Sequence, residues 1–153
     1  GLIVAFAIFL PVALLSWLFV KDESIVVPQG DGKEGLVRIL VRATPVYVRI
    51  ARSQEERTLG LSYTKALPEN EGLLMIFPEK GKHGIWMKAM NYPIDIIWIE
   101  EGKVVTIAEN VNPDSYPKTF HPTLPVRYVL EVPAGFAEIH GILEGDRVEG
   151  LPE

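Results

Sequence analysis

The sequence contains no cysteine at any of its 153 positions. This absence excludes disulfide bonds, thiol nucleophiles, cysteine-ligated metals and a lipid anchor attached through cysteine. Histidine is scarce as well, because His83, His121 and His140 are scattered along the chain and no HxxxH or HExxH spacing occurs. We therefore expect no metal site and no bound cofactor.

Sequence motifs of common enzyme classes are missing too. The segment GLSYT at 60–64 lacks the second glycine of the hydrolase pattern GxSxG, and there is no phosphate-binding glycine loop. The net charge is −5 and the chain has no basic patch, which disfavours a nucleic-acid partner. These absences favour binding over catalysis, with catalysis kept as an alternative.

One long hydrophobic run is present at the beginning of the sequence. Residues 1–20, GLIVAFAIFLPVALLSWLFV, carry no charge, and as a helix they would span about 30 Å, the thickness of a bilayer core. We predict a hydrophobic helix over 1–21, either transmembrane or otherwise buried, followed by a flexible linker over 22–35. Because Lys21 and Lys33 are outnumbered by four acidic residues between 21 and 34, we expect the following domain to lie outside the cytoplasm.

The remainder, 36–153, is predicted to form one mainly β domain. Its strands are indicated by period-two alternation or short apolar runs, and a Ser53–Glu56 capping box predicts the first of two short helices. Gly102, in the turn EEGK, predicts a hairpin. The predicted fold class is α+β, a small barrel-like or rolled mixed sheet with two short helices, preceded by the N-terminal hydrophobic helix. The predicted strands are 36–42, 45–51, 73–77, 86–90, 94–99, 127–132 and 146–149; 79–84 and 110–125 are predicted loops, and 133–141 is the second helix.

An ordered series of motifs runs through this domain, formed by Arg57, Gly60, Leu61, 72–77, Trp86, Met87, Lys88, Asn91, 93–96, 128–131, Gly145 and Asp146. These motifs resemble those of the Domain of Unknown Function 192 (DUF192) family. The resemblance extends from about residue 50 to 148, but Ser62 stands where a methionine is usual, and Ala89 and Met90 lengthen the step from Lys88 to Asn91. The family implies no activity that can be transferred, although its members often carry an export signal or an anchor.

Asp95 is the most unusual residue of the predicted strands. In PIDIIWIE, alternation places apolar residues on both faces, so the carboxylate of Asp95 is expected in or beside a core. A buried carboxylate is costly unless it is paired or hydrogen-bonded. Its partner could be Lys88, Arg127, or backbone amides of the NYP segment or of 110–125.

Two interpretations of this region remain open. In the first, Trp86 is the apolar wall of a cleft and Asp95 orients a polar ligand, with Lys88, Asn91, Glu131 and Arg57 completing the set of binding residues. In the second, Asp95 ties a loop to the sheet and Trp86 fills the core.

These observations lead to one functional expectation and two alternatives. We expect a membrane-anchored domain outside the cytoplasm that binds a small polar ligand or a protein partner through 84–95 and 110–125, and that is not an enzyme. The first alternative is a hydrolase of envelope or carbohydrate material that uses Asp95 and Glu131. The second is a structural subunit of a membrane complex or filament, assembled through the N-terminal helix.

Overall fold

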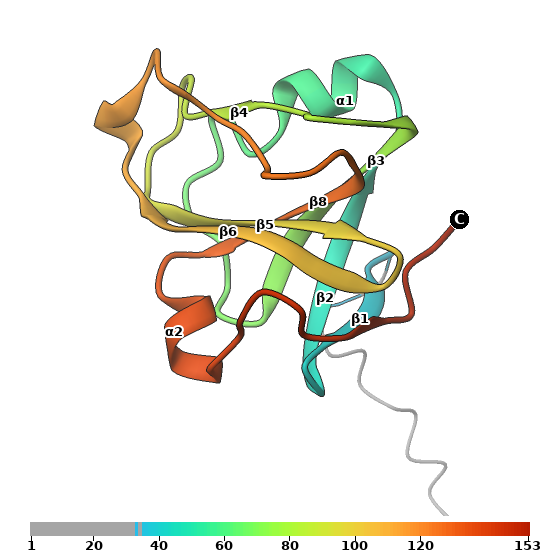
Figure 1. The fold of residues 1–153 in the computed structure, drawn as a ribbon. Helices are drawn as coiled ribbons and strands as arrows, with labels where there is room; N and C mark the ends of the chain where they lie inside the picture. Colours follow the sequence, from blue (N-terminus) through green and yellow to red (C-terminus); the bar gives the residue numbers. More distant parts are fainter. Residues whose placement is uncertain (1–32, 34) are drawn as a thin grey trace, which may run out of the picture. The chain divides into compact units, whose positions relative to one another are not determined.

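The computed structural model describes Lys33 and residues 35–153 (Figure 1). The predicted helix over 1–21, most of the predicted linker over 22–35 and any assembly through the N-terminal helix lie outside these residues. Among the residues described, no helix has the length and apolar character needed to cross a membrane.

A mixed, curled sheet of seven strands organises the domain, in the order β6-β5-β8-β3-β2-β1-β9 (Figure 1). All neighbours are antiparallel except β2 and β3, which are parallel and are joined through α1. The expected mainly β, rolled mixed sheet with two short helices is thus confirmed. The elements are β1 (Val37–Val41), β2 (Thr44–Ala51), α1 (Gln54–Leu59), β3 (Glu71–Gly81), β4 (Ile85–Trp86), β5 (Ile94–Glu100), β6 (Lys103–Val111), η1 (Pro113–Ser115), β7 (Thr119–Phe120), β8 (Val126–Pro133), α2 (Phe136–His140) and β9 (Val148–Glu149).

Each face of the sheet buries its own apolar cluster, because successive side chains of a strand point to opposite sides. Along β5, Ile97 and Ile99 pack with Phe136 and Ala137 of α2 on one face. Ile96 and Trp98 pack instead with Leu61, Met75 and Met87 on the other face, which α1 and β4 cover (Figure 1). The two-sided apolar pattern of IDIIWI follows directly from this arrangement.

Two predicted element boundaries are wrong. The expected polar loop over 79–84 is shorter, because β3 continues to Gly81 after an irregularity that begins beyond Ile76. The expected strand over 86–90 ends at Trp86, since Ala89 has a positive φ of 56° and the chain turns there. The predicted loop over 110–125 also contains η1 and β7.

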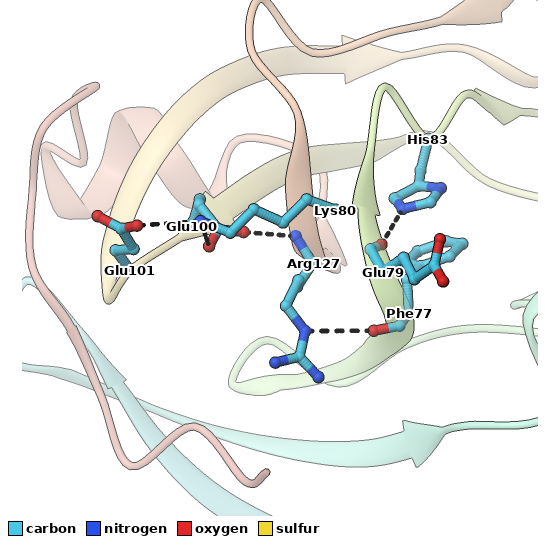
Figure 2. Close-up of polar contacts among 7 residues, drawn as sticks. All are labelled: Phe77, Glu79, Lys80, His83, Glu100, Glu101 and Arg127. Carbon is cyan, nitrogen blue, oxygen red and sulfur yellow. Dashed lines mark hydrogen bonds and ion pairs between the residues drawn. The ribbon is translucent and has the colours of Figure 1, made fainter.

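The β5–β6 hairpin closes where EEGK predicted it, with positive φ at Glu101 and Gly102. Ion pairs tie this turn to β3 (Figure 2): Lys80 Nζ lies 2.7 Å from Glu100 Oε1 and 3.0 Å from Glu101 Oε1. Glu100 Oε2 also accepts a hydrogen bond from the backbone N–H of Arg127 on β8, at 2.7 Å. The β5–β6 hairpin is therefore anchored to β8 and to β3, the next two strands of the sheet.

Asp95 is fully buried on the α2 face and is satisfied by the backbone. Its carboxylate accepts hydrogen bonds from the amides of Asn110 at 2.8 Å, Gly135 at 3.1 Å and Ala137 at 2.8 Å. An amide at the start of 110–125 was one of the expected partners, whereas Lys88 and Arg127 are not partners. Asp95 thus ties the end of β6 and the start of α2 to the sheet, as the structural interpretation predicted.

Replacing Asp95 with alanine should lower the free energy of unfolding by about 3–5 kcal/mol, because three amides would lose a charged acceptor at once. Urea denaturation of Asp95→Ala and the unchanged chain measures this difference. Glu109→Ala, which removes an exposed carboxylate from β6, is the control and should change stability by less than about 0.5 kcal/mol. Equal stability of Asp95→Ala and the unchanged chain would contradict the anchoring role.

Candidate ligand-binding cavity beneath helix α1

Helix α1 covers the face of the sheet opposite to α2 but buries none of its own residues. It begins at the predicted capping box, in which the Glu56 N–H donates to Ser53 Oγ at 3.1 Å and the Ser53 N–H donates to Glu56 Oε2 at 2.8 Å. Arg57 holds the helix in place by donating to the carbonyl oxygens of Ile76, at 3.0 Å, and of Arg52. Because the helix is attached at its polar side chains, space is left between it and the sheet.

That space is a cavity of about 250 Å³, which we call the inner cavity. A more open hollow of about 490 Å³, the outer depression, shares part of its lining, including Leu59 and Trp86. Together they reach the size range of small-molecule sites. The inner cavity is lined by Gln54, Arg57, Thr58, Leu59, Gly60, Leu61, Ser62, Met75, Phe77, Gly84, Ile85, Trp86, Met90 and Glu131. The outer depression adds Glu55, Tyr63, Lys88 and Ala89.

Gly60, which ends α1, allows this close approach. Its φ is +53°, and a Cβ at this position would lie 3.3 Å from Met75 Cε and 3.7 Å from Glu131 Oε2. A larger residue would be strained by the backbone conformation, and its Cβ would be tight against Met75 Cε and in van der Waals contact with Glu131 Oε2. Glycine at this position therefore keeps the helix end close to the cavity floor.

Glu131 is the buried ionisable group of the inner cavity. It lies on β8 opposite Leu73 of β3 and Ile96 of β5, and it is only 4% exposed. Among the residues that the structure describes, its Oε2 has no hydrogen-bond partner. Burial raises the pKa of Glu131 from 4.5 to about 8, while the charge of Arg49 on β2 acts in the opposite direction. At pH 7 this carboxyl is therefore mainly neutral and able to donate a hydrogen bond.

The wall formed by Phe77 is held from both its ring and its backbone (Figure 2). His83 stacks on the ring with a centroid distance of 3.6 Å, and His83 Nε2 donates to the carbonyl of Glu79 at 2.9 Å. Arg127 Nε donates to the Phe77 carbonyl at 3.5 Å, and the Arg57 guanidinium lies 4.8 Å from the ring centroid. These contacts fix one side of the inner cavity.

Trp86 stands between the inner cavity and the outer depression. The residue is 45% exposed, and its ring meets Tyr116 edge to face at 6.2 Å. Lys88 Nζ lies 5.6 Å from the Trp86 ring centroid. Trp86 is therefore a wall residue, and the interpretation that it fills the core is wrong.

The six binding residues predicted from the sequence separate in the structure. Arg57, Trp86 and Glu131 line the inner cavity, and Lys88 lines the outer depression. Asn91 and Asp95 line neither; Asn91 Nδ2 instead donates to the Thr64 carbonyl at 2.8 Å.

Asp95 and Glu131 cannot form the carboxylate pair of the hydrolase alternative. In the β5–β8 ladder, Asp95 is opposite Val132 and Glu131 is opposite Ile96, so the two side chains point to opposite faces of the sheet. This prediction was wrong because the sequence does not reveal the register between distant strands. In the part of the chain that the structure describes, no group of three or more metal-ligating side chains is found either.

Sequence reasoning missed Met75, Met90, Leu59 and Gly60 of the cavity lining. The available signal was the capping box, which located α1 correctly. The sequence did not reveal that β2 and β3 pair in parallel. This pairing makes α1 a crossover helix and brings the helix over Glu131.

The model of the DUF192 family, described as Uncharacterized ACR, matches residues 37–150. The chain belongs to the DUF192 family. This confirms the resemblance found in the sequence. No curated protein matches the chain.

Two solved structures are similar to this DUF192 domain. A protein from Sinorhizobium meliloti 1021, provisionally named a transcription regulator, is 33% identical with a TM-score of 0.69, over 75% of this chain and 92% of the other. A protein of unknown function from Novosphingobium aromaticivorans DSM 12444 is 28% identical with a TM-score of 0.70, over 74% of this chain and 84% of the other. The domain is therefore shared at nearly its full length with both proteins.

The buried Glu131 should make the stability of the domain depend on pH. Because the pKa of Glu131 is about 8 in the folded state and 4.5 is its ordinary value, the unfolded state loses its proton first as pH rises. The stabilising contribution of the neutral carboxyl is thus complete below pH 4.5 and is lost as pH rises towards about 8.

Glu131→Gln keeps the shape but cannot ionise, so its advantage in unfolding free energy over the unchanged chain should grow to a few kcal/mol between pH 5 and pH 8. Urea denaturation at both pH values measures this difference. Glu109→Gln is the matched exposed control. A constant difference between Glu131→Gln and the unchanged chain would contradict the buried, neutral carboxyl.

Proposed function

We propose that this DUF192 domain binds a small molecule in the inner cavity. The apolar body of the ligand would lie against Met75, Phe77 and Trp86, and a polar group of the ligand would meet the Glu131 carboxyl. One observation carries the proposal: Glu131 Oε2 is buried at the cavity wall without a hydrogen-bond partner. A bound ligand would supply the hydrogen bond that this atom lacks.

The comparison with Asp95 supports a binding role for Glu131. Both carboxyl groups are buried, but Asp95 accepts three amide hydrogen bonds, whereas Glu131 Oε2 accepts none. An unsatisfied buried polar group costs about 1–3 kcal/mol, and such costs are typical of functional sites. Packing alone would be served better by an apolar residue at position 131.

The lining favours binding rather than catalysis. Glu131 shares the inner cavity with Arg57, whose guanidinium already donates to two backbone carbonyls and holds α1. In the described part of the chain, Glu131 is the one carboxyl group of the inner lining, so the inner cavity does not contain the pair of carboxyl groups that the hydrolase alternative requires. The provisional name of the S. meliloti protein suggests gene regulation, but a net charge of −5 does not favour contact with DNA, and we do not extend that role to this chain.

The three methionines of the chain offer a direct test, because Met75 and Met90 line the inner cavity, whereas Met87 is buried in the same apolar cluster but is not part of the lining. We expect six-carbon probes such as hexanamide to shift the methyl NMR signals of Met75 and Met90 in a saturable way. The Met87 signal should stay in place. Probes that move all three signals equally, or none of them, would contradict binding in the inner cavity.

Trp86→Ala should weaken this binding about tenfold, because it removes an aromatic wall. Its melting temperature should change little, since the ring is half exposed. Leu124→Ala, an exposed apolar residue outside the cavity lining, is the matched control and should bind normally. A large loss of stability in Trp86→Ala would show that the ring stabilises the fold, and it would contradict the binding role.

We further propose that residues 1–20 attach the domain to a membrane and that the domain lies outside the cytoplasm. Support comes from the uncharged hydrophobic run and the acidic segment after it. In cells expressing the full chain, the protein should remain with membranes after an alkaline wash. A single Leu143→Cys, in a chain with no other cysteine, should react with a membrane-impermeant maleimide.

Leu10→Arg together with Leu14→Arg should release the chain from membranes, because two arginines in the run cost roughly 5–7 kcal/mol of insertion free energy. The matched control is Leu143→Arg, at an exposed position of the domain, which should remain bound. Recovery of the unchanged chain in the soluble fraction would contradict the proposed anchor.

A further inference from the structure

We infer that the inner cavity selects neutral ligands that present a carbonyl oxygen to Glu131, and that it rejects amines. This inference rests on the proposed function and adds to it the chemical class of the ligand. It follows from the groups that surround Glu131 on every side.

The elements around Glu131 supply apolar side chains and two cations. Leu73 of β3 and Ile96 of β5 flank it in the sheet. Arg49 of β2 donates to the Gly60 carbonyl at 3.3 Å, and its positive charge acts on the Glu131 carboxyl. Arg57 of α1 lines the same cavity. His83 contacts the cavity through the Phe77 ring and is not part of the lining.

This distribution of charge disfavours an amine. A ligand ammonium would enter beside the guanidinium of Arg57 and near that of Arg49, and it would also pass Lys88 of the outer depression. Like charges at short range in a poorly solvated site repel each other. The carboxylate of Glu55 lies in the outer depression rather than in the inner lining, so within the inner cavity a negative counter-charge would require Glu131 to give up its proton, which burial opposes.

An anionic ligand is disfavoured for a different reason. The Arg57 guanidinium, the cation of the inner lining, is already engaged with the carbonyls of Arg52 and Ile76. A carboxylate in the inner cavity would have to leave water, and pairing with Nη1 of Arg57 would compete with the two hydrogen bonds that hold helix α1.

A neutral carbonyl compound fits both the protonated Glu131 carboxyl and the apolar lining of the inner cavity. The protonated carboxyl of Glu131 has one O–H to donate, and a carbonyl oxygen accepts it without bringing charge into the cavity. The formerly unpartnered Oε2 would then take part in a hydrogen bond. The apolar body of the ligand would replace water against Leu61, Met75 and Met90.

Three probes of matched size test the inference on the full chain: hexanamide, hexylamine and hexanoate. The readout is the Met75 and Met90 methyl shift, with Met87 as the internal control. At pH 7 we expect hexanamide to bind at least tenfold more tightly than the other two probes. From pH 7 to pH 9 its affinity should fall about tenfold, because a Glu131 that titrates at about 8 loses the proton it donates.

Glu131→Gln separates the effect of Glu131 on binding from any other pH effect on the chain. Its amide N–H₂ still donates, so hexanamide should bind with an affinity that no longer changes with pH, while Glu131→Leu, which has no donor, should bind hexanamide about tenfold more weakly. Tighter binding of hexylamine, or of hexanoate, would overturn the inference and leave the proposed function standing. Binding of none of the three at Met75 and Met90 would overturn both.

Discussion

Taking a carboxyl group out of water costs several kcal/mol unless the group is hydrogen-bonded or neutral. The central sheet of this domain buries two carboxyl groups, and each avoids that cost in a different way. Asp95 on β5 and Glu131 on β8 lie in neighbouring strands but point to opposite faces. Asp95 receives three backbone amides and joins distant segments together. Glu131 receives no partner at Oε2 and is kept neutral by burial. The Asp95 carboxyl stabilises the fold, and the Glu131 carboxyl lies in the site that we propose for a ligand.

The cavity around Glu131 results from how the chain passes from β2 to β3. These strands are parallel, so the connection must cross over the sheet, and α1 lies on that crossover. The helix is attached by capping and by Arg57 rather than by buried apolar residues. With Gly60 at its end, the chain approaches Glu131 closely without filling the space between. Trp86 and Phe77 complete the walls of the inner cavity, which we propose as the ligand site.

Local signals predicted local structure well. Ser53 with Glu56 located the start of α1, and EEGK located the β5–β6 turn, because both depend on residues close together in sequence. The burial of Asp95 followed from strand alternation. The supposed pairing of Asp95 with Glu131 was wrong, since it depends on register between strands far apart in the chain. Met75 and Met90 were missed for the same reason, and the helix over 1–21 stays a prediction.

The central claim is that Glu131 is buried, lacks a hydrogen-bond partner at Oε2 and is neutral at pH 7. The most direct test is a pH titration of the Glu131 side-chain carboxyl carbon, followed by ¹³C NMR in the folded chain. The account predicts a titration midpoint near 8, well above the ordinary value of 4.5. A midpoint close to 4.5 in the folded protein would mean that water or another group stabilises the carboxylate, and it would contradict the account.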